Sequence, residues 1–138
     1  IPESVELQIT TRAFSPAVRD RLEERLPALA RAQAESFGAR ADVSYSRGFP
    51  PVINHAQETV FAREVARRHF PSAQIAETFQ PRTASEDFAF MLQERPGSYL
   101  FVGNGESAPL HSPHYDFNDT VIAPAARFWV RLAEAYLS

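Results

Sequence analysis

Residues 5–16 read VELQITTRAFSP, and this stretch predicts the first structural unit of the chain. Apolar or small side chains alternate with polar ones from Val5 to Phe14, which is the period-two pattern of a strand with one buried face. Ser15 and Pro16 then predict a helix start, because serine is a favoured N-cap and proline is favoured at the first helical position. A strand followed directly by a helix is typical of an α/β protein.

The segment after Pro16 completes this unit. The helix is expected to end at Gly38, and Pro27 is expected to kink or split it. A second alternating stretch, residues 41–46, predicts another strand. Two strands and one helix leave raw sheet edges, so we expect this unit to need partner strands that the chain does not contain.

The rest of the chain has a different pattern. We expect helices over residues 56–69, from a Ser85 cap to Pro96, and over residues 119–137, with a strand buried on both faces at residues 98–102. Helices flanking a buried strand again indicate an α/β layer with most of its sheet missing. The inward stripe of the last helix is expected to be Ile122, Ala126, Trp129, Ala133 and Tyr136 or Leu137.

Composition excludes several functions. The 138 residues contain no Cys and no Lys, which removes disulfides, thiolate metal sites and lysine-based mechanisms. A net charge of −3 suggests neither a nucleic-acid nor a membrane partner. No apolar run approaches the ~20 residues of a membrane span and no signal peptide opens the chain, so we expect a cytoplasmic protein. All-arginine basic usage beside abundant Ala and Pro predicts a GC-rich bacterial source.

The densest polar cluster is residues 110–119, which read LHSPHYDFND. It follows the predicted buried strand, and ligands gather at the carboxyl ends of strands in open α/β sheets. His111 and His114 are each capable of binding a metal ion as neutral imidazoles, but a polar loop before a capped helix is an equally open interpretation. A calcium loop is excluded, because Val121 and Arg127 stand where its Gly and Glu belong.

Two further candidates have structural alternatives that stay open. Ser85 with Glu86 and Asp87 is explained by a helix cap followed by acids that complement the helix dipole. Arg12 lies on the polar face of the first predicted strand, where a guanidinium is able to hold a carboxylate with two hydrogen bonds or simply face solvent.

The LHSPHYDFND string resembles the C-terminal signature of the aminoacylase, hippurate hydrolase and carboxypeptidase G family of two-metal amidohydrolases. Further stretches fall in the family's order: residues 1–3 before the first strand, GFPPVIN at 48–54, SEDF at 85–88 and the segment 97–105. Ala84 departs from the pattern, since the family has Gly before the SEDF motif.

The resemblance implies an α/β fold in two parts. Residues 1–53 match the second half of a ferredoxin-like lid domain, which is often used for dimerisation, so a homodimer through the lid is expected. Residues 54–138 match the C-terminal segment of a metallopeptidase-like catalytic domain. The start at Ile1 resembles a start in mid-protein, and the missing N-terminal part would be the chain's partner.

The resemblance also implies roles for particular residues. His111 maps onto a metal ligand, whereas His114 maps onto a variable, solvent-facing position. Arg12 maps onto an arginine that holds the substrate carboxylate, and Glu86 onto the shell that supports the active site. The general-base Glu and the other ligands of two divalent ions (Zn, Mn, Co or Ni) lie N-terminal to the lid, so this chain alone is expected to be inactive.

The expected function is therefore that of the C-terminal portion of a metal-dependent amidohydrolase. Its substrate would be an N-acyl amino acid, such as hippurate, or a small peptide-like conjugate. The alternative is a non-catalytic fragment that acts only as a self-association module, in which residues 1–53 add strand to strand across a two-fold axis. Upstream sequence with carboxylate and imidazole ligands would favour the enzyme.

Overall fold

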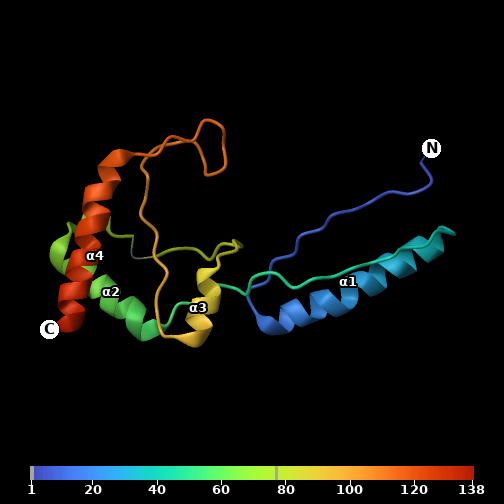
Figure 1. Ribbon diagram of the computed structural model, residues 1–138, viewed down its shortest axis with the longest axis horizontal. Coiled ribbons are helices and arrows are strands. Elements are labelled where there is room, and N and C mark those ends of the chain that lie inside the picture. The colour runs from blue at the N-terminus through green and yellow to red at the C-terminus, as the bar shows by residue number, and fades with distance from the viewer. Residues whose placement is uncertain (1, 77) are drawn as a thin grey trace. The chain divides into compact units, whose positions relative to one another are not determined.

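The computed structural model describes residues 2–76 and 78–138 (Figure 1). Contacts within the chain define two units: Ile1–Val52 with Pro81–Met91, and Ile53–Gln80 with Leu92–Ser138. The predicted division into a lid segment, residues 1–53, and a catalytic segment, residues 54–138, stays a prediction.

The first unit is built around the long helix α1, Pro16–Ser36. Its start is the predicted one, because the Ser15 hydroxyl accepts a hydrogen bond from the Val18 amide at 3.3 Å. Its end is a Schellman motif in which Gly38, at φ 70°, donates to the Glu35 carbonyl and Ala39 donates to the Ala34 carbonyl. The helix is continuous through Pro27, so the predicted split is wrong.

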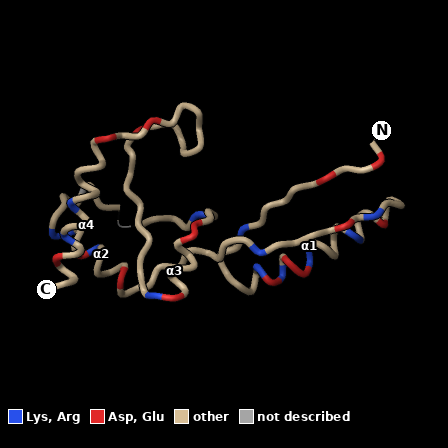
Figure 2. Tube along the Cα trace, in the orientation of Figure 1, with Lys and Arg blue, Asp and Glu red and all other residues tan. Residues whose placement is uncertain are grey.

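Residues 39–52 run back beside α1 (Figure 1) and are tied to it by charged side chains. Both signs of charge are interleaved along α1 (Figure 2). Arg47 donates to Asp20 at 2.6 Å and also pairs with Glu23, while Arg19 donates to the Gly48 carbonyl. The hydrogen bonds with Glu23 and Asp20 raise the pKa of Arg47 above its ordinary value.

The alternation predicted for residues 41–46 is visible in their burial. Ala41, Val43 and Tyr45 are half-buried, whereas the residues between them are exposed. The backbone nevertheless forms no strand, because no ladder partner lies beside it among the described residues. Side-chain burial here therefore follows from packing beside a helix and not from a sheet.

The predicted strand at residues 5–14 is also not formed in the described chain. Its apolar face is exposed, with Leu7 at 79%. Thr11 Oγ1 lies 3.1 Å from Tyr45 Oη, which links this segment to residues 39–52 through side chains. A strand buries one face only when neighbouring strands and a second layer are present, and the alternating sequence cannot supply those by itself.

The second unit rests on the packing of α2, Ala56–His69, against α4, Ile122–Leu137. Both helices were predicted, although residues 119–121 form a 3₁₀ turn, η2 (Asp119–Val121), ahead of α4. Ala62 and Val65 of α2 are buried. After α2, the Phe70 ring lies 6.3 Å from Phe128, and a second short turn, η1 (Ser72–Gln74), follows.

The predicted inward stripe of α4 is wrong except at Tyr136, whose ring lies 6.3 Å from that of Phe61 in α2. Trp129 is 58% exposed, and Ile122, Tyr136 and Leu137 are exposed as well. The half-buried stripe instead consists of Ala125, Phe128, Leu132 and Ala135. The helix is thus apolar on two faces, which is the composition of a helix buried on both sides. No helix in the described ranges has the length and hydropathy of a membrane span.

Residues 97–99 are fixed to the beginning of α2 by a set of hydrogen bonds. The Asn54 amide donates to the Tyr99 carbonyl at 2.9 Å and accepts from the Tyr99 N–H at 2.7 Å. His55 repeats this arrangement, since its N–H donates to the Gly97 carbonyl and its Nδ1 accepts from the Gly97 N–H. The Asn54 side chain therefore bonds the N–H and the carbonyl of Tyr99, as the backbone of a neighbouring strand would.

The segment 98–102 itself is not the predicted buried strand. Phe101 and Val102 are exposed, and the described residues provide it with no sheet partner. Phe79 stacks on Phe101 with ring centroids 4.9 Å apart. The apolar run thus contacts the Phe79 side chain, but no strand of the described residues covers it.

The short helix α3, Phe88–Glu94, begins later than predicted. Ser85 precedes it by a full turn and is not its N-cap; instead the Glu86 and Asp87 carbonyls accept from the next turn. Ala89 and Leu92 are buried, and the Phe49 ring lies 5.7 Å from Phe90. Ala89 and Leu92 are thus the buried residues of a helix that begins three residues after the predicted cap.

Replacement of Gly38 is expected to destabilise the end of α1. Gly38→Ala places a Cβ on a residue with φ 70°, which costs about 1 kcal/mol of free energy of unfolding. Gly48→Ala is the matched control, because Gly48 has no positive φ and no heavy atom within 4 Å of its added Cβ. Urea unfolding of both variants checks this, and an equal effect at the two glycines would contradict it.

Replacement of Asn54 is expected to release residues 97–99 from α2. Asn54→Asp keeps an acceptor for the Tyr99 N–H but loses the donor to the Tyr99 carbonyl, at a cost of about 1–2 kcal/mol. Gln57→Glu is the control, since it makes the same chemical change at an exposed site in the first turn of α2. Hydrogen exchange of the Tyr99 amide should accelerate only in Asn54→Asp; acceleration in neither variant would refute the expectation.

Candidate functional site

The polar cluster predicted at residues 110–119 lies in a long loop, residues 103–118. The loop leaves the extended segment 98–102 and enters η2 and α4, in the chain order expected from the sequence. Asn118 caps the helical end, since its Oδ1 accepts from the Thr120 N–H at 3.1 Å and from the Thr120 hydroxyl at 2.6 Å.

His111 sits at a strained position in this loop. The Ser112 N–H donates to the Pro109 carbonyl at 3.1 Å, which makes His111 the third residue of a four-residue turn. Its φ is 68°, and such a turn normally has Gly or Asn at that position. A histidine there costs about 1 kcal/mol or more, and it is the one non-glycine residue with positive φ in the described ranges.

A second turn follows immediately and fixes the other side of His111. The Tyr115 N–H donates to the Ser112 carbonyl at 3.0 Å, and the Ser112 hydroxyl accepts from the His114 N–H at 3.2 Å. Two consecutive turns that share Ser112 therefore restrain the backbone at His111 and directly after it.

Asn104 and Asn118 close the base of the loop. The Asn104 Oδ1 accepts from the Asn118 N–H at 2.8 Å, and the Asn104 Nδ2 donates to the Asp116 carbonyl at 2.8 Å. In return, the Asn118 Nδ2 donates to the Asn104 carbonyl at 3.3 Å. We call these two residues the asparagine pair.

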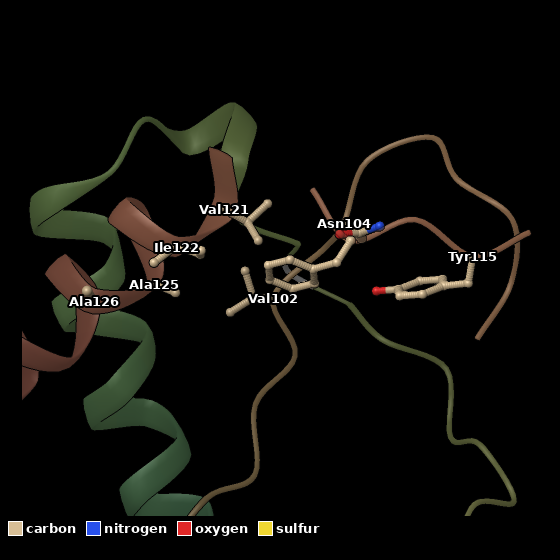
Figure 3. A pocket seen from close by; sticks show the side chains of 8 residues that line it. Val102, Asn104, Tyr115, Val121, Ile122, Ala125 and Ala126 are labelled. Atoms are coloured by element: carbon tan, nitrogen blue, oxygen red, sulfur yellow. The ribbon is translucent and has the colours of Figure 1, made fainter. Parts of the chain in front are cut away.

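An open, mainly apolar pocket of about 430 Å³ lies beside the asparagine pair (Figure 3). Figure 3 shows Tyr115 and Asn104 on one side of the pocket and Val102, Val121 and Ile122 on the other. The lining residues are Val102, Asn104, Tyr115, Phe117, Val121, Ile122, Ala125 and Ala126. The pocket is thus lined by residues of the loop and of α4 together.

The His111 ring is exposed, and no described side chain or carbonyl is hydrogen-bonded to it. A free, neutral imidazole suits a role as one ligand of a divalent metal ion. Among residues 2–76 and 78–138, no three His, Asp or Glu side chains come together as a metal site. The described residues therefore supply one metal ligand and not a complete metal site, since a catalytic metal ion needs about three protein ligands.

The other predicted site residues belong to a different unit of the chain from this loop. Arg12 and Glu86 belong to the first unit, whereas His111 belongs to the second. Arg12 is exposed, and its guanidinium donates to the Thr11 carbonyl at 3.2 Å. Glu86 is half-buried ahead of α3. His114 is exposed, as the resemblance implied.

Sequence reasoning missed the asparagine pair. Its signal was present, because Asn104 stands between Gly103 and Gly105 directly after an apolar run, where asparagine often bonds to nearby backbone. The pairing with Asn118 depends on closure of the loop and was not readable from either residue alone.

Comparison with known proteins agrees with the order of motifs along the whole chain. The model of peptidase family M20/M25/M40 matches residues 2–135. An N-acetyl-L-cysteine deacetylase of Bacillus subtilis is 31% identical over 137 residues, which cover 99% of this chain and 32% of that protein. A hippurate hydrolase of Campylobacter jejuni is 28% identical over 137 residues, covering 99% and 36%.

An IAA-amino acid hydrolase of Arabidopsis thaliana is 32% identical over 146 residues, which cover 99% of this chain and 33% of the relative. The chain thus spans about a third of the length of the curated relatives it matches. No solved structure matches it. The match of the family model over nearly all residues confirms the resemblance to the aminoacylase and hippurate hydrolase family: the chain belongs to peptidase family M20/M25/M40.

Proposed function

We propose that these residues form the C-terminal portion of a metal-dependent amidohydrolase that cleaves N-acyl amino acids. The relatives are named for N-acetyl-L-cysteine, hippurate and IAA–amino acid conjugates, whose common feature is an amide between an acyl group and the nitrogen of an amino acid. The observation that carries the proposal is the exposed His111 ring, held at a strained position in the family's C-terminal motif.

His111 would serve as one ligand of one of two divalent ions. When bound, these ions would supply an activated water and polarise the scissile carbonyl. The contribution of this chain is to present an imidazole from a loop whose backbone is held by two turns. The other ligands and the general-base Glu are proposed to come from residues outside this chain, so these residues alone are proposed to be inactive.

Arg12 would bind the carboxylate of the amino-acid half of the substrate. Its guanidinium is exposed and has one hydrogen bond, to the Thr11 carbonyl, among the described residues. A carboxylate is the ligand that a planar guanidinium holds best, through two parallel hydrogen bonds. Glu86 is proposed to support the site without binding metal, in keeping with its half-buried position.

The first unit is proposed to pair with a second copy of the protein. Val5, Leu7 and Ile9 are all more than 70% exposed, and the backbone of residues 5–14 forms no ladder within the described chain. Strand addition across a two-fold axis would cover both features. This pairing also supports the alternative function, a self-association module without catalysis, which loss of activity in the variants below would exclude.

Replacement of His111 should abolish metal-dependent hydrolysis in the full-length protein. Changes in residues that merely support a metal ligand cost 10- to 100-fold, so loss of the ligand itself should cost about 100-fold or more in kcat/KM for hippurate. His114→Ala is the matched control, because it is an exposed histidine of the same loop. Parent-level activity in His111→Ala would refute the assignment.

Replacement of Arg12 should weaken binding of substrates that carry a free carboxylate. Arg12→Ala is expected to raise KM for hippurate about tenfold or more with a smaller change in kcat, since the lost contact serves binding. Arg40→Ala, at an exposed ion pair with Asp42, is the control variant. The decisive comparison is an amide of hippurate without its carboxylate: an equal loss on that substrate would rule out carboxylate binding.

A further inference from the structure

We infer that Asn104, through its pairing with Asn118, is a positioning residue that sets the direction of the His111 ring. The inference rests on the proposed function of His111 as a metal ligand and goes beyond it. It begins from the strain at His111, because a histidine at φ 68° keeps that conformation only when its surroundings impose it.

The restraint comes from hydrogen bonds that connect His111 to the base of the loop without a gap. His111 lies inside the turn closed by Ser112 and Pro109, and Ser112 begins the next turn, which is closed by Tyr115. The following residue, Asp116, has its carbonyl bound by the Asn104 amide at 2.8 Å. The backbone that carries the imidazole is thus linked step by step to Asn104.

The asparagine pair also connects this restraint to α4. Asn118 uses its Oδ1 to cap the helical start at Thr120 and its Nδ2 to bond the Asn104 carbonyl. Both asparagines are half-buried, and Asn104 lines the apolar pocket with Tyr115 and Phe117 (Figure 3). Water therefore competes less well for the part-buried bonds between the two asparagines, whereas the bond from Asn104 to the Asp116 carbonyl is exposed.

Both asparagines use their side-chain amide as donor and acceptor, and Asn104 is the one whose side chain makes two bonds across the loop. Asn104 makes three side-chain hydrogen bonds, to Ser107, Asp116 and Asn118, and the last two reach across the loop. An amide is required, because one group must both donate to a carbonyl and accept from an N–H. Neither a carboxylate nor a hydroxyl reproduces that pair at these distances.

The test measures Zn²⁺ affinity of the full-length protein by competition with a chelator, beside the thermal midpoint of the metal-free protein. Asn104→Ala is expected to weaken zinc binding about 10- to 100-fold, the usual effect of removing a partner that orients a ligand. Glu106→Ala is the control, because Glu106 is an exposed residue of the same loop. Its zinc affinity should equal that of the parent.

A second variant keeps the test decisive if Asn104→Ala fails to fold. Asn118→Asp retains the oxygen that caps Thr120 but loses the donor to the Asn104 carbonyl. Like Asn54→Asp, it should lower the thermal midpoint of the metal-free protein modestly, and it should also weaken zinc binding severalfold. A purely structural role predicts the lowered midpoint with parent zinc affinity, and that result would overturn the inference.

Two outcomes separate this inference from the proposed function. Parent zinc affinity in both asparagine variants, with loss of zinc in His111→Ala, overturns the role of the pair and leaves His111 as a ligand. Parent zinc affinity in His111→Ala overturns both. An equal loss in Glu106→Ala would show that any change in the loop disturbs the metal, and would overturn the specific role of Asn104.

Discussion

Every peptide group in an extended segment carries an N–H and a C=O that need hydrogen-bond partners. This requirement decides which of the predicted elements form in this chain. Residues 5–14, 41–46 and 98–102 satisfy few of these groups with other described residues. The helices fold on their local signals, while the sheet-forming segments require neighbours.

This difference explains which predictions succeeded. The ends of α1 were readable because Ser15 and Gly38 act within one turn of the helix. The strands were not realised because a strand depends on pairing with another segment, which alternation alone does not provide. The face of α4 was misassigned because its sequence is apolar on two sides, and only the packing of α2 shows which side is covered within the chain.

The candidate site divides in the same way. The motif around His111 was readable, and so was its place between an apolar run and a helix. The positive φ of His111 and the pairing of Asn104 with Asn118 were not, because they arise from closure of a loop across fourteen residues. Local sequence thus identifies the chemical group, whereas non-local hydrogen bonds determine its orientation.

The face of α4 that α2 does not cover carries Trp129, the single tryptophan of the chain. An indole in water emits at longer wavelength than one in an apolar environment. The fluorescence colour of this protein is therefore set by whatever packs on that face, and it separates a bare helix from a covered one without any label.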